Sequence, residues 1–93
     1  MLSVEIDLIL IKALLSKVIF DKYFSLIDLN TLSEEAKIIL HALDVYFKDK
    51  PDEVQLTLTK FSPWFISLHN NWSSDQQEYY KNIFSRIDRK SVV

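Results

Sequence analysis

The sequence predicts an all-α fold, a small bundle of about four to five helices that contains a short helical hairpin and no sheet. A chain of 93 residues is long enough for one domain with one modest core. Its composition, 48% hydrophobic and 26% charged, is that of an ordinary globular protein. Apolar residues recur at helical spacing in four segments, and no segment has a secure strand pattern. We therefore expect residues 1–88 to form a single helical domain and residues 89–93 to be a tail or the start of a linker.

The first predicted helix spans residues 3–20, and its apolar residues cover most of its circumference. A surface helix normally carries an apolar stripe only a little wider than a third of a turn. This helix should therefore be buried on two sides, either at the centre of the bundle or against another copy of the chain. The second possibility makes four of its residues candidates for an interface, namely Ile11, Leu14, Leu15 and Val18.

A short helical turn is expected over residues 21–29, followed by a longer helix that ends near Asp49. Thr31 and Glu34 have the spacing of a capping box, in which a hydroxyl and a carboxylate three residues later satisfy free amides. Pro51 prevents this helix from continuing. The apolar residues of its inner face are Ala36, Ile39, Leu40, Leu43 and Phe47.

The pattern of residues 52–62 is ambiguous, because it alternates like a strand but also fits a helical face. A lone strand in a helical chain has nothing to pair with, so helix or irregular helix-like turns are favoured. Ser62 and Pro63 then predict an N-cap followed by proline at the first position of a short helix ending near His69.

The last predicted helix follows a turn at Asn70–Asn71, where asparagine tolerates the left-handed conformation that glycine would otherwise supply. A second capping box from Ser73 to Gln76 begins this helix, which should run to about Asp88.

Several function classes are excluded or disfavoured by composition. The chain has no cysteine, which excludes disulfides and thiolate sites, and no glycine, which excludes the P-loop and the dinucleotide fingerprint. Its 11 basic and 13 acidic residues lack the positive surplus that drives strong nucleic-acid binding. His41 and His69 have no metal-ligand spacing, and no catalytic constellation is present. We therefore expect no enzymatic activity, no cofactor and no metal.

The N-terminal apolar segment fits neither a signal peptide nor a membrane span, because charged residues interrupt it. We expect a cytoplasmic protein. Aromatic residues are concentrated in the second half of the chain, and core packing accounts for most of them. Aromatic residues are also enriched at protein interfaces, which makes Trp64 and Trp72 two further candidates for an interface.

Three segments together resemble a known family. The segments LIKALLSKVIFDKYFSLID, LSEEAKIILHALDVYF and FSPWFISLHNNWSSDQQEYYKNIFSRI are similar, in order and spacing, to the N-terminal domain of DnaB-type replicative helicases encoded by bacteriophages. The resemblance extends from about Leu8 to Ile87. It implies a small helical bundle without ATPase residues that supports the subunit contacts of a hexameric collar and docks primase or a helicase loader.

Three hypotheses follow. The first is a non-catalytic oligomerisation and docking domain of a phage replicative helicase, located in the cytoplasm of the bacterial host. The second is a stand-alone small helical phage protein that binds a replication protein. The third, a DNA-binding regulator, is disfavoured by the net charge of -2.

Overall fold

The computed structural model describes residues 2–89, and it confirms the all-α fold. These residues form five α-helices with two short 3-10 turns, and none of them lies in a strand. The α-helices are α1 (Leu2–Ala13), α2 (Lys17–Tyr23), α3 (Glu34–Asp49), α4 (Leu58–Leu68) and α5 (Ser74–Asp88). The 3-10 turns are η1 (Phe24–Leu26) and η2 (Leu29–Thr31).

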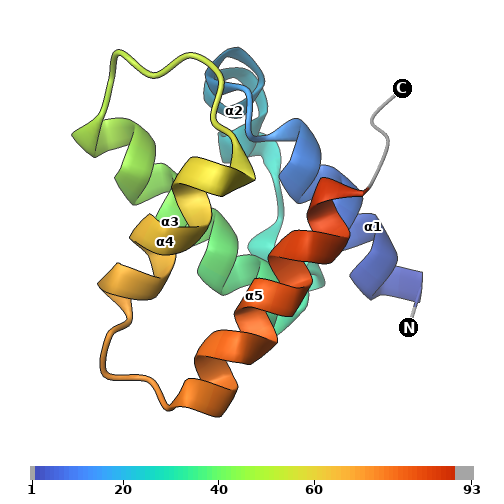
Figure 1. Ribbon diagram of the computed structural model, residues 1–93. Coiled ribbons are helices and arrows are strands. Elements are labelled where there is room, and N and C mark those ends of the chain that lie inside the picture. The colour runs from blue at the N-terminus through green and yellow to red at the C-terminus, as the bar shows by residue number, and fades with distance from the viewer. Residues whose placement is uncertain (1, 90–93) are drawn as a thin grey trace.

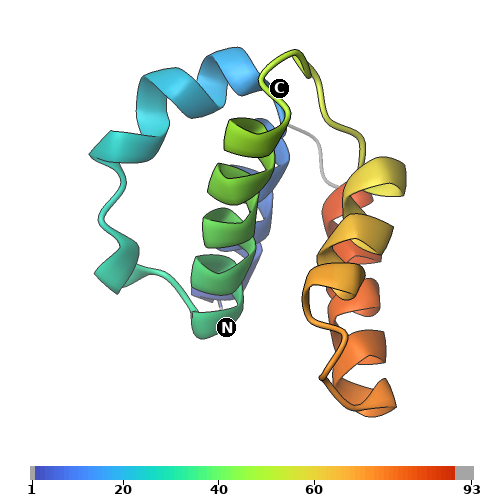
Figure 2. The ribbon, with the colours of Figure 1, turned by 90° about the vertical axis from the view of Figure 1, so that its left-hand side faces the viewer.

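The helices are arranged around α1 and α3. Helix α1 packs against both α3 and α5, while α4 and α5 lie side by side and form the predicted helical hairpin (Figures 1 and 2). The segment of α2, η1 and η2, residues 17–31, leaves the bundle and returns along one side of α3 (Figure 2). We call this segment the arm.

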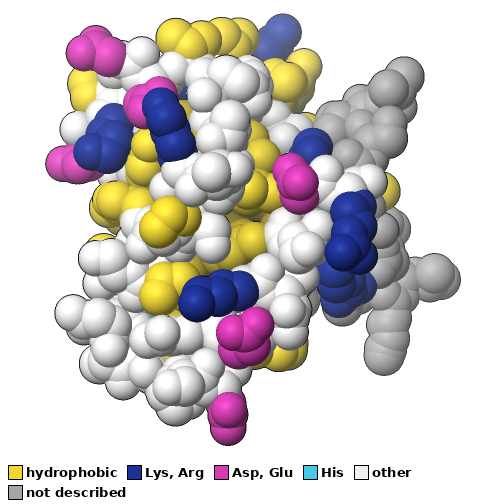
Figure 3. Space-filling view, viewed as in Figure 1, with side chains coloured by type: hydrophobic (Ala, Val, Ile, Leu, Met, Phe, Trp, Pro, Cys, Tyr) yellow, Lys and Arg dark blue, Asp and Glu magenta, His cyan; other side chains and the backbone are white. Residues whose placement is uncertain are grey.

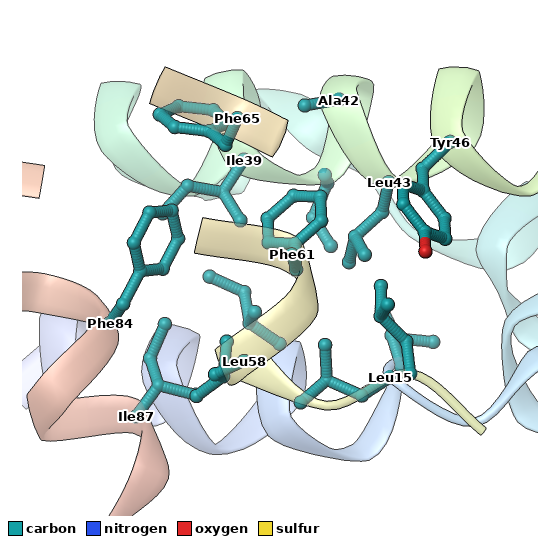
Figure 4. Close-up of a cluster of buried hydrophobic side chains, with 14 of the residues drawn as sticks. Leu15, Ile39, Ala42, Leu43, Tyr46, Leu58, Phe61, Phe65, Phe84 and Ile87 are labelled. Carbon is teal, nitrogen blue, oxygen red and sulfur yellow. The ribbon is translucent and has the colours of Figure 1, made fainter. Parts of the chain in front are cut away.

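The core is centred on two phenylalanines of α4. Phe61 and Phe65 are fully buried, and Figure 4 shows them among side chains of α3 and α5. The Phe84 ring of α5 lies edge-on to both of them, at centroid distances of 5.6 Å from Phe61 and 5.1 Å from Phe65. The predicted inner face of α3 is confirmed, because Ala36, Ile39, Leu40, Leu43 and Phe47 are all buried.

The single helix predicted over residues 3–20 is wrong, because the chain breaks after Ala13 and resumes as α2 at Lys17. Backbone groups of a distant loop replace the missing helical hydrogen bonds. The Lys17 amide donates to the carbonyl of Val54 at 2.8 Å, and the Leu56 amide donates to the carbonyl of Leu15 at 2.9 Å. These bonds hold residue 16 in an extended conformation, in a single bridge to residue 55.

The predicted start of α4 at Ser62 is also wrong. The helix begins one turn earlier, where the Thr57 hydroxyl accepts a hydrogen bond from the Lys60 amide. Pro63 therefore lies inside the helix, where proline costs about 3 kcal/mol. The proline ring is exposed. The earlier start buries Leu58 and Phe61, and burial of two such side chains contributes about 1.5–3 kcal/mol each.

Two further details concern helix ends. The N-cap of α3 is Ser33, whose hydroxyl accepts from the Ala36 amide at 3.2 Å, so the expected cap at Thr31 is wrong. The N-cap of α5 is Ser73, as expected, and α5 ends at Asp88. Residues 70–71 do form a turn, but no described residue there or elsewhere has a positive φ.

The C-terminal end of α5 is tied to α1. The Lys12 ammonium donates to the backbone carbonyl of Asp88 at 2.9 Å, where a cation also complements the negative end of the helix dipole. Residues 90–93, which include most of the expected tail or linker, lie outside the described residues.

The position of the α3 cap can be tested with a matched pair of variants. Ser33→Ala should lower the free energy of unfolding by about 1 kcal/mol, because the Ala36 amide loses its acceptor. Thr31→Ala should lower it by less, because the Thr31 hydroxyl only donates to the exposed carbonyl of Asp28. Urea unfolding of the two variants measures both values. A larger loss for Thr31→Ala would contradict the assignment of the cap.

Candidate interaction surfaces

The structure separates the candidate interface residues of the first predicted helix into two groups. Ile11, Leu14 and Leu15 are buried in the core of a single chain, with Ile11 only 1% exposed. They therefore present no side chain to a partner. Helix α1 is buried on two sides by α3 and α5 of the same chain, so the alternative of a central helix is the one observed. Val18, on α2, is 66% exposed and remains a candidate.

Val18 is one of several exposed apolar side chains on the arm. Four large hydrophobic side chains of this segment are exposed, namely Val18, Tyr23, Leu26 and Leu29, and we call them the arm patch. Leu26 is the most exposed of them, at 75%. Figure 3 shows the face formed by α4 and α5, where hydrophobic side chains are spread among polar ones, whereas most of the arm lies on the far side in that view (Figure 2). Sequence analysis found only Val18, because the break between α1 and α2 was not foreseen.

The opposite side of the arm fixes its position. The buried Phe20 ring stacks on Phe24 at 4.5 Å and contacts the Phe47 ring of α3 at 5.1 Å. The Lys17 ammonium and the Asp21 carboxylate form an ion pair within α2 at 2.7 Å. Aromatic packing therefore holds the arm against α3 while the arm patch faces away from the core.

Trp64 and Trp72 are half-buried and lie in the aromatic core rather than projecting from it. The Trp64 ring packs edge-on against Tyr46 at 5.0 Å. The Trp72 ring lies between two others, stacked on His69 at 4.0 Å and on Tyr80 at 4.8 Å. Burial raises the pKa of Tyr80 to about 12. The interface role of the two tryptophans stays a prediction.

A groove that sequence analysis missed lies between α3 and the end of α4. Its volume is about 260 Å³, and it is lined by Lys37, Ile38, His41, Ala42, Leu68 and His69. The two histidines, which are far apart in the sequence, therefore lie at one site. The only signal in the sequence was the helical spacing of Ile38, His41 and Ala42, which puts them on one side of α3.

A smaller pocket of about 70 Å³ lies between α1, α3 and α5. It contains Asp7, which is 3% exposed and whose carboxylate accepts a hydrogen bond from the Ser33 amide at 2.9 Å. This amide belongs to the N-cap residue of α3, where the helix dipole also favours a negative charge. Asp7 therefore has a structural explanation, as an anchor between α1 and the start of α3.

A second carboxylate lines the same pocket. The Tyr79 hydroxyl donates to the Glu35 carboxylate at 2.6 Å, and this hydrogen bond holds the pKa of Glu35 below its ordinary value of 4.5. The bond links α5 to the first turn of α3. The carboxylates of the pocket thus join helices, and the space between them has room for a few atoms at most.

Within residues 2–89, no three His, Cys, Asp or Glu side chains are grouped so that they could hold a metal ion. No helix in this part of the chain combines the length and apolar character that crossing a bilayer requires.

The sequence matches no protein-family model, and comparisons with curated proteins and with solved structures likewise found no match.

The link between Tyr79 and Glu35 should make stability depend on pH. Because the folded-state pKa of Glu35 is depressed, its contribution is present above pH 4.5 and is lost as the pH falls through the folded pKa. Tyr79→Phe should therefore lower the free energy of unfolding by about 1 kcal/mol or less near pH 7, and by less still near pH 3.

Urea unfolding at the two pH values measures this difference. Tyr23→Phe is the matched control, because Tyr23 is similarly exposed and lies on the arm, away from Glu35. An equal loss of stability for Tyr79→Phe at both pH values would contradict the assigned link.

Proposed function

We propose that this chain is a non-catalytic oligomerisation and docking domain, of the kind that precedes the motor of phage DnaB-type replicative helicases. The observation that carries the proposal is the arm patch. Four large apolar side chains lie exposed on one segment that buried aromatic rings hold in place. A contiguous exposed apolar patch marks a protein interaction site, and in this proposal the four side chains together form one.

The identity of the assembly is proposed from the resemblance of residues 8–87 to the helicase domain. In this proposal, copies of the chain contact one another through the arm patch and support a hexameric collar. Primase or a helicase loader docks on other surfaces, in the cytoplasm of the bacterial host. The chain itself binds no nucleic acid strongly, in keeping with its net charge of -2.

The arm patch gives the proposal a direct test. Light scattering after size-exclusion chromatography should give the wild-type chain a molar mass several times 11.0 kDa at high concentration. Val18→Asp and Leu26→Asp should each raise the dissociation constant at least about tenfold, since each places a charge in the apolar contact. Leu68→Asp is the control, because Leu68 is exposed on α4, outside the arm.

Two results would contradict this assignment. A wild-type chain that stays monomeric at high concentration would remove the oligomerisation role. Unchanged assembly of both arm variants, with their circular dichroism intact, would place the interface elsewhere.

The alternative is a stand-alone small helical phage protein that binds a replication protein. The groove between α3 and α4 favours it, because this groove provides a docking surface that does not depend on self-association. The intact mass of the native gene product separates the two hypotheses. A product several times heavier than 11.0 kDa supports the helicase, and a product of 11.0 kDa supports the stand-alone protein.

A further inference from the structure

The groove between α3 and α4 has an apolar floor and one open apolar wall. Ala42 is buried on α3, and its short side chain leaves a hollow between the two helices. Ile38 lies one turn earlier on α3 and is half-buried. Leu68, the last residue of α4, is 49% exposed. An apolar side chain seated here would remove the exposed part of Leu68 from water, which favours binding.

Each polar side chain that lines this groove either carries a positive charge or gains one when it is protonated. These side chains are Lys37 and His41 on α3 and His69 at the end of α4, and no carboxylate is among the lining residues. This contrasts with the net charge of the chain, which is -2. Two acids of α3 that lie within one turn of lining residues along the helix each have a lysine partner: Glu34 pairs with Lys37 at 3.3 Å, and Asp44 pairs with Lys48 at 3.1 Å. Such exposed pairs contribute little and exchange readily.

His69 is held at the groove by aromatic packing. Its ring stacks on Trp72 at 4.0 Å with an interplanar angle of 10°, and it contacts the Phe65 ring at 4.7 Å. Trp72 in turn stacks on the Tyr80 ring of α5 at 4.8 Å. His69 is the member of this aromatic column that lines the groove. An imidazolium in that position would also gain a cation–π contact with the indole.

The groups around His69 favour its neutral form in the free chain. Burial lowers the pKa of His69, and the groups that face it across the groove from α3 are Lys37 and His41, neither of which is an acid. On its own side, the rings of Phe65 and Trp72 are uncharged, and Tyr80 behind them keeps its proton. A carboxylate arriving from outside would reverse this balance and favour the imidazolium.

We propose that this groove binds an acidic amphipathic segment of a partner protein, with an apolar side chain against Ile38, Ala42 and Leu68 and a carboxylate beside the two histidines. The lining residues include a lysine and two histidines but no carboxylate, which favours this occupant over a basic segment. The proposal deepens the proposed docking role, but it requires neither the arm patch nor self-association. Docking takes up protons, since each histidine that gains a carboxylate neighbour becomes easier to protonate.

The test uses a synthetic helical peptide of leucine, alanine and glutamate, and a second peptide with lysine in place of every glutamate. Trp72 reports binding by its fluorescence through the stacked His69, in a Trp64→Phe background that leaves one tryptophan. The glutamate peptide should bind at least about tenfold more tightly than the lysine peptide. Its affinity should rise about tenfold from about pH 8 to about pH 6.

Variants separate the two parts of the site. Leu68→Ala should weaken binding about tenfold at both pH values, because it removes the apolar wall. His41→Gln combined with His69→Gln should keep the affinity seen near pH 8 and abolish its rise at lower pH. Val54→Ala is the control, since it shortens an exposed apolar side chain outside both the groove and the arm patch, and it should leave binding of the peptide unchanged.

Each contrary result overturns the proposal. The first would be the absence of saturable binding of the glutamate peptide, the second equal binding of both peptides, and the third an affinity that does not depend on pH. Octanoate that binds as tightly as the peptide would make this a site for a small amphiphile. Self-association lost in Leu68→Ala would make the occupant a second copy. These outcomes do not test the proposed oligomerisation, which is measured independently by the molar mass of the wild-type chain and of the two arm variants.

Discussion

The packing of Phe61 and Phe65 between α3 and α5 is the contact on which the rest of the structure depends. It brings the end of α4 close to the middle of α3, where the basic groove forms. It also explains why α4 tolerates Pro63. The helix must start before the proline to bury Phe61, and the hydrophobic gain offsets the lost backbone hydrogen bond. The hairpin then places Trp72 and Tyr80 behind His69.

A second, smaller constraint creates the arm. The loop over residues 54–56 takes over the backbone groups of Leu15 and Lys17, so that a continuous first helix cannot form. The chain turns away at this point, and Phe20 returns it to α3 through Phe47. The apolar residues that precede the break are enclosed by the core, and those that follow it are partly left outside. One break therefore separates the residues that stabilise the fold from those available for contact.

The parts of the fold that depend on local sequence could be predicted. The lengths of α3 and α5 follow from their apolar spacing and their ends, and the Ser73 cap was identified correctly. The break after Ala13 could not be predicted, because its cause lies some forty residues away in the chain. The start of α4 was missed because Pro63 favours a helix start locally, whereas burial of Phe61 decides it. The joint site of His41 and His69 depends on how α4 packs, which no spacing within the sequence reveals.

The central claim is that the core uses the apolar residues of the first helix and leaves the arm patch to make contacts between copies. Amide NMR spectra recorded over increasing protein concentration test it most directly. Residues 18–29 should show concentration-dependent shifts, while the amides of Ile11, Leu14 and Leu15 stay unchanged and exchange slowly with solvent. Shifts confined to residues 8–15, or no shifts at any concentration, would contradict the account.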